Sequence, residues 1–161
     1  MITALSERPE EIRHFFAAPW QFQQTFKTPL KDLNRFVSTF LALFSLEKGA
    51  LSTDEVAFEP KKLLQLLAGK SVQLENVWSF DLNVKGQQGI AELLEAVLGD
   101  WVDFAFVPLP ESFAIYADHD EYTTFYANYE SDLSALVMEL ENAGFTPVVG
   151  YTRGGIDGGR R

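Results

Sequence analysis

Four consecutive polar residues, Asp118-His119-Asp120-Glu121, are the first place where this sequence could carry chemistry. Carboxylates and imidazole are the groups that most often bind metal ions and transfer protons in enzymes. A metal-assisted hydrolase or a small-ligand binder would use this cluster together with carboxylates from other strands, such as Asp103. A metal site, however, needs ligands that converge from at least two places. Because aspartate favours turns, the cluster fits a polar hairpin turn better than a catalytic site.

Other catalytic signatures are missing from the sequence. The second histidine, His14, is far from the cluster along the chain, and no H-E-x-x-H motif is present. Gly86-Gln-Gln-Gly89 lacks the third glycine and the lysine of a phosphate-binding loop. The chain has no cysteine and no G-x-S-x-G elbow. We therefore expect no cofactor, no resident metal and no covalent catalysis, and the interpretation leans away from an enzyme.

The acidic residues are concentrated in one segment. The 161 residues include 13 Lys and Arg against 23 Asp and Glu, which gives a net charge of −10. Residues 86–152 contain twelve Asp and Glu and no Lys or Arg, whereas the rest of the chain is close to neutral. Such a segment repels phosphate, which argues against direct binding to nucleic acid. It favours a partner that is itself basic.

Hydrophobic periodicity predicts an α+β fold, with N-terminal helices followed by the order β-α-β-β-β-α-β. We expect a mostly antiparallel sheet with helices packed on at least one face. The first half is predicted to hold helices over 9–18, from 28 to near 47–49, and over 60–69, with an irregular linker over 19–27 and an ambiguous stretch over 50–58. The second half is predicted to hold strands over 78–84, 101–107, 113–117, 122–128 and 145–151, and helices over 88–98 and 131–143.

These elements are expected to form a single α+β domain over residues 1–151. Its helical part spans about 1–70 and its sheet-containing part about 71–151. Residues 152–161 contain four glycines and one apolar side chain, which is typical of a flexible tail. The first thirteen residues lack an apolar run, and the longest wholly apolar run, 40–44, is too short to cross a bilayer. Together with the absence of cysteine, this predicts a cytoplasmic protein without a membrane segment.

A period of two assigns the side chains of the C-terminal strands to two faces of the sheet. One face receives apolar residues typical of a core. The other face receives aromatic and acidic residues, namely Trp101, Asp103, Tyr116, Asp118, Tyr122 and Tyr126. Tyrosine and tryptophan are enriched in binding hot spots. This second face is either an open binding surface or a face covered by the N-terminal helices, and both interpretations remain.

The acidic segment, the aromatic face and the lack of a catalytic motif together indicate a non-catalytic acidic binding protein. We expect it to recognise and neutralise a basic protein, as an immunity or antitoxin-type inhibitor does to a nuclease or another toxin domain. The expected contact residues are Asp103, Tyr116, Asp118, Asp120, Glu121, Tyr122 and Tyr126. Two alternatives stay open: the hydrolase or ligand binder built on the 118–121 cluster, and a structural subunit or homo-oligomer that pairs through the aromatic face.

Overall fold

A computed structural model describes residues 1–17, 19–53 and 55–153, and these contain seven strands and five helices. In chain order the elements are β1 (Ile2–Leu5), α1 (Glu10–Ala17), β2 (Phe22–Lys27), α2 (Leu33–Leu41), β3 (Lys48–Thr53), α3 (Lys61–Gly69), β4 (Phe80–Lys85), α4 (Gln87–Gly99), β5 (Phe104–Leu109), β6 (Ala114–Ala117), β7 (Tyr122–Ala127) and α5 (Glu130–Asn142).

The strands form one sheet in the order β1-β4-β3-β5-β6-β7-β2. Every neighbouring pair is antiparallel. Strands β5, β6 and β7 are consecutive in the chain and adjacent in the sheet, so the predicted hairpin between β6 and β7 is confirmed. The predicted α+β class with an antiparallel sheet is confirmed as well.

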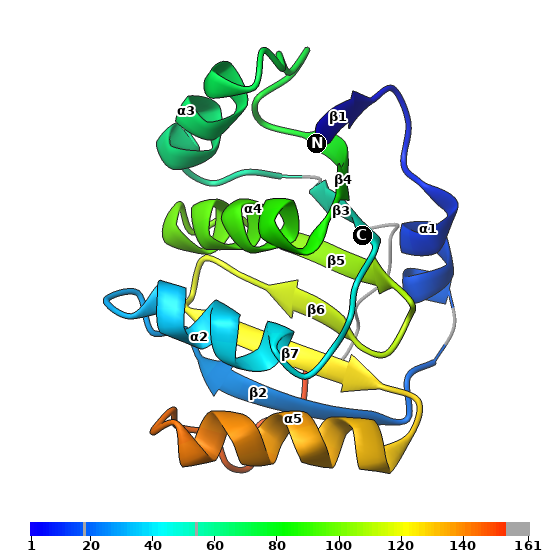
Figure 1. The fold of residues 1–161 in the computed structure, drawn as a ribbon, viewed down its shortest axis with the longest axis vertical. Coiled ribbons are helices and arrows are strands. Elements are labelled where there is room, and N and C mark those ends of the chain that lie inside the picture. The colour runs from blue at the N-terminus through cyan, green and yellow to red at the C-terminus, as the bar shows by residue number, and fades with distance from the viewer. Residues whose placement is uncertain (18, 54, 154–161) are drawn as a thin grey trace.

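Helices cover the two faces of the sheet unequally. Helices α2, α4 and α5 lie side by side across one face, and α3 packs on α4 (Figure 1). The larger core fills this interface, where the Phe40 ring lies 5.6 Å from Phe36 and 5.0 Å from Phe125 between centroids. Among the helices of the described residues, α1 alone packs on the opposite face, against β3 and β5. None of these helices, over the ranges described, combines the length and the apolar character required to cross a membrane.

The first 70 residues, predicted as a helical part, also contribute three strands. Strand β2 replaces part of the expected linker, and its edge position explains the weak pattern, because Thr25 and Phe26 are both buried while facing opposite sides. Strand β3 is central and buried on both faces. It therefore lacks the alternation that identifies a half-buried strand. Helix α2 spans only Leu33–Leu41 of the longer predicted helix, because residues 28–32 form turns in which the Leu30 amide donates to the Thr28 carbonyl and the Asp32 amide to the Pro29 carbonyl.

The last predicted strand, 145–151, is reduced to a single bridge between Pro147 and Phe26. Proline has no N–H to donate, which interrupts a hydrogen-bonded ladder. The segment nevertheless follows the outer edge of β2, since the Val148 amide donates to the Thr25 carbonyl at 2.8 Å. Of the tail predicted over 152–161, Thr152 and Arg153 are described, and 154–161 lie outside the described residues.

Gly49→Ala is expected to destabilise the protein, because β3 passes close to the Phe106 ring of β5. A Cβ at position 49 would lie 2.5 Å from two carbons of that fully buried ring. Overpacking of this kind costs about 1–3 kcal/mol of unfolding free energy. In urea denaturation the midpoint should fall while the slope stays constant. Gly69→Ala is the matched control, since its Cβ would meet no atom within 4 Å; an equal loss in both variants would contradict the packing argument.

Candidate functional site

The polar cluster 118–121 forms the turn between β6 and β7. The Asp118 Oδ1 atom accepts hydrogen bonds from the amides of Asp120 at 2.9 Å and Tyr122 at 3.2 Å. The Asp118 amide donates to the Tyr122 carbonyl at 3.1 Å, and Glu121 has a φ of 68°. An aspartate that binds the backbone of its own turn is the arrangement that its short side chain favours. The cluster therefore folds as the polar hairpin turn that its residue types predict.

His119, at the tip of this turn, is held by Asp103, which precedes β5. The His119 amide donates to Asp103 Oδ1 at 2.6 Å, and His119 Nδ1 lies 2.9 Å from Oδ1 and 3.1 Å from Oδ2. A carboxylate only accepts, so the Nδ1 atom carries the proton. This hydrogen bond is the main reason that the pKa of His119 is raised; partial burial opposes it, and the charges of Asp103, Asp120 and Asp118 add to it.

Two exposed aromatic rings extend this site. The Phe58 ring lies 5.6 Å from Trp101 and 6.4 Å from the His119 ring, between centroids. Phe58 is 49% exposed and Trp101 is 39% exposed, whereas the Asp120 side chain is 80% exposed. We call these five residues the acidic-aromatic rim: Phe58, Trp101, Asp103, His119 and Asp120. They come from three loops that meet at the end of the sheet where β3 and β6 finish and β5 and β7 begin.

Asp100 positions Trp101 and Phe58 relative to each other. It is buried, and its two carboxylate oxygens accept the amides of Lys62 at 3.1 Å and Leu63 at 2.8 Å. These amides are among the unsatisfied donors at the start of α3, so Asp100 acts as a helix cap supplied from another element. Because Phe58 precedes α3 and Trp101 follows Asp100, the cap ties the two loops together.

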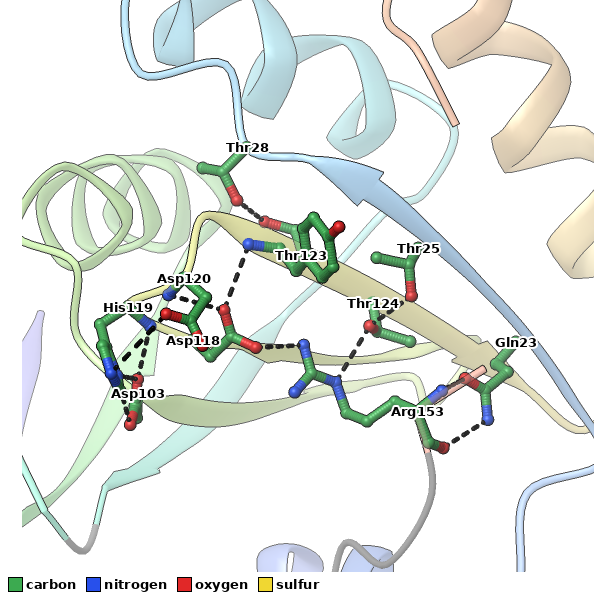
Figure 2. A network of polar contacts seen from close by, with 11 residues as sticks. Gln23, Thr25, Thr28, Asp103, Asp118, His119, Asp120, Thr123, Thr124 and Arg153 are labelled. Atoms are coloured by element: carbon green, nitrogen blue, oxygen red, sulfur yellow. Dashed lines mark hydrogen bonds and ion pairs between the residues drawn. The ribbon is translucent and has the colours of Figure 1, made fainter. Parts of the chain in front are cut away.

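On the face of the sheet beside the rim, the Arg153 side chain lies across β6 and β7. Its Nη2 atom is 2.8 Å from Asp118 Oδ2, and its Nε atom donates to Thr124 Oγ1 at 3.1 Å (Figure 2). The guanidinium carbon lies 4.9 Å from the centre of the Tyr116 ring. The Asp118 carboxylate therefore has both oxygens in use, one for its turn and one for Arg153.

The second sheet face is partly covered, which answers the question that the sequence left open. Helix α1 covers Tyr126, whose ring contacts Phe15 at 5.4 Å and Trp20 at 6.4 Å. Tyr126 is 4% exposed, because α1, which the strand pattern does not reveal, lies over it, so the free protein does not present this ring on an open surface. Burial raises the pKa of its hydroxyl, which has no hydrogen-bond partner among the described residues.

The other predicted contact residues lie near the rim but differ in accessibility. Asp103 and Asp120 belong to the rim, and Glu121 follows Asp120 in the same turn. Tyr116 lies beneath Arg153, and the Tyr122 ring contacts Tyr151 at 5.0 Å. Asp118 is bound to Arg153. The predicted residues are therefore brought together at one end of the sheet, with only part of the set open to a partner.

Sequence reasoning missed Phe58 and Arg153. Phe58 lies in a stretch without a clear period, and only its exposure beside Trp101 identifies it. Arg153 was assigned to a flexible tail because glycines follow it. A signal was present, since it is the first basic residue after the acidic segment 86–152.

The described part of the chain contains no group of three or more His, Asp or Glu side chains arranged to hold a metal ion. Comparison of the chain with protein-family models, with curated proteins and with solved structures finds no match in any of the three. The function is therefore argued from the site itself.

Asp103→Asn is expected to lower the pKa of His119, because the amide keeps an oxygen for the turn but loses the charge that favours imidazolium. An NMR titration of the His119 ring protons checks this, with His14 on α1 as the internal reference. A raised folded-state pKa stabilises the protein below the unfolded value, near pH 6.5, and this stabilisation is lost as pH rises through the folded value. The difference in unfolding free energy between wild type and variant should thus shrink as pH rises from about 6.5 through the folded-state pKa of His119. If the NMR titration midpoint of His119 were the same in the variant and in wild type, Asp103 would be excluded as the cause of the raised pKa.

Proposed function

We propose that this protein is a non-catalytic acidic binding protein that recognises and neutralises a basic protein partner, in the manner of an immunity or antitoxin-type inhibitor. The observation that carries the proposal is the acidic-aromatic rim, where the exposed Phe58 and Trp101 rings lie beside His119, and His119 contacts the half-buried Asp103 and the exposed Asp120. Complementary charge speeds the encounter and selects a basic partner, while buried aromatic anchors supply lasting affinity.

The two rings of the rim are suited to be such anchors. Phe58 and Trp101 contact each other, and Asp100 holds their loops together, so they lose little conformational freedom on binding. A stable protein seldom leaves a large ring half exposed beside a second one unless the surface is used. The rim therefore offers apolar area that a partner could cover.

The charge around the rings supports a cationic partner. Asp103 and Asp120 both contact His119, whose ring lies 6.4 Å from Phe58. The whole segment 86–152 supplies twelve carboxylates without a lysine or arginine. A nuclease has an active site with positive potential, because its substrate is a polyanion. A surface of opposite sign would compete with that substrate, which is how binding would become inhibition.

His119 is better suited to shape this surface than to catalyse a reaction. Its Nδ1 is occupied by Asp103, and its Nε2 lies 3.9 Å from Asp120. No serine or threonine hydroxyl is hydrogen-bonded to its ring within the described residues. Nucleophilic catalysis would require a nucleophile within hydrogen-bond reach of that base.

The combined variant Trp101→Ala, Asp120→Lys is expected to bind the partner more weakly than wild type does. Tagged wild-type protein would be used to purify the partner from extracts of its own cells, and the partner's activity would be assayed with and without it. Removing an aromatic anchor and reversing a charge should weaken binding by about 30-fold or more. Inhibition should weaken in parallel and should also fall as salt rises, because screening reduces the attraction.

The matched control is Met138→Ala, Glu139→Lys, which changes an exposed apolar residue and an exposed acid on α5, across the sheet from α1. It should bind the partner as wild type does. Equal binding by both double variants, or a captured partner that is acidic and insensitive to salt, would contradict the proposal.

A further inference from the structure

Arg153 occupies a site in which Asp118 and Thr124 are also oriented by contacts that do not involve Arg153. Asp118 is oriented by the two amides of its own turn, which bind Oδ1 and leave Oδ2 directed at the guanidinium. Thr124 is oriented by Thr25, whose hydroxyl lies 2.7 Å from its own across the β2–β7 pair. The carboxylate, the hydroxyl and the Tyr116 ring would keep these positions if the arginine left. We call these three residues the guanidinium cradle.

The cradle matches a guanidinium group and not merely a positive charge. Nε of Arg153 donates to Thr124, Nη2 forms an ion pair with Asp118 at 2.8 Å, and the planar group lies over the Tyr116 ring. An arginine presents a rigid fork and a flat face, which can satisfy all three at once. A lysine ammonium is a compact charge without a flat face, so it would fill this site less well.

The cradle is also well shielded from water. The Arg153 side chain is 11% exposed and that of Asp118 is 15% exposed. Tyr126, two residues beyond Thr124 on the same face of β7, adds a buried hydroxyl without a hydrogen-bond partner in the described structure. A shielded carboxylate without a cation would be costly, so the cradle requires an occupant.

The segment that delivers Arg153 is anchored at Arg153 itself and exposed just before it. The Gln23 side chain clamps the Arg153 backbone, accepting from its amide at 2.7 Å and donating to its carbonyl at 3.0 Å (Figure 2). Before it, Val149 is 90% exposed, and Gly150 and Thr152 are exposed as well. The segment could therefore leave the cradle without disturbing either core.

We propose that this cradle is a binding site for an arginine side chain of the basic partner, and that Arg153 fills it in the free protein until the partner's arginine replaces it. This inference rests on the proposed function for the identity of the partner, but the guanidinium site itself is tested without one. Arg153 then prevents an empty, shielded carboxylate in the free protein, and the exchange selects partners that present arginine rather than lysine.

The first experiment adds arginine back to a protein that lacks Arg153. N-acetyl-arginine methylamide is titrated into full-length Arg153→Ala, and the backbone amides of Gln23, Asp118 and Thr124 are followed by NMR. We expect saturable shifts with a Kd of about a millimolar. The corresponding lysine derivative should bind at least about tenfold more weakly. Asp118→Asn in the same background should abolish the shifts.

Two control proteins define the site. Wild type should bind the arginine derivative far more weakly than Arg153→Ala, because its own side chain occupies the cradle. Arg13→Ala removes an exposed arginine from α1 and should not create a binding site. If Arg153→Ala does not fold, Arg153→Lys serves instead, since it retains a cation on the same backbone. Equal shifts with both derivatives, or equal binding by wild type and variant, would overturn the inference.

The second experiment uses the purified partner and tests the exchange. Arg153→Ala should bind the partner more tightly than wild type, because no internal competitor remains. Weaker binding by this variant would identify Arg153 as an ordinary contact and overturn the exchange. If no basic partner exists, the proposed function fails while the titration with the arginine derivative still decides the guanidinium site.

Discussion

The unequal covering of the seven-stranded sheet is the constraint on which the rest of the structure depends. Four helices complete the core on one side, whereas α1, with eight residues, covers only part of the other. The strands that pass beyond α1 still present side chains to that face. Those side chains cannot be wholly apolar, because no helix removes them from water, and they cannot be unpaired, because neighbouring strands and the C-terminal segment shield them. Polar pairs such as Asp118 with Arg153 and Thr25 with Thr124 are the result.

The sequence pattern predicts the fold well where one face of a strand is wet. Strand β4 lies close to its predicted range because its residues alternate between buried and more exposed positions. Strands β6 and β7 are buried almost throughout, and their ranges follow instead from β-favouring residues bounded by turn residues. Strand β3 is buried on both faces and β2 lies at an edge, so neither shows a period of two. Strand β1 has four residues, which is too short for any period to be read. Strands β2 and β3 are therefore missed because their two faces differ little in environment, whereas β1 is missed because it is short.

The sequence predicts where the acidic residues of the site gather, but it does not predict how deeply each side chain is buried. Alternation predicts Asp103 and Asp118 on one face, and the structure places them next to the paired ends of β5 and β6, where Phe104 pairs with Ala117. It assigns Tyr126 to the same face but carries no information on α1, which buries it. Phe58 and Arg153 reach the site from segments with no period, and their positions depend on single tertiary contacts: the Asp100 cap for one and the Gln23 clamp for the other. Such contacts join residues distant in the chain and leave no local signature.

The segment 86–152 contains no lysine or arginine, so its shielded carboxylates need partners of another kind or from elsewhere in the chain. Three of these carboxylates each have a different kind of partner. Asp100 receives two backbone amides of α3, Asp103 receives the imidazole of His119, and Asp118 receives an arginine from beyond the segment. All three compensations come from side chains or amides that also fix the geometry of the site. Other carboxylates, such as that of Asp120, remain exposed to water, which solvates their charge. The acidic excess of the segment is thus divided between carboxylates that build the site and carboxylates that remain free to attract a cationic surface.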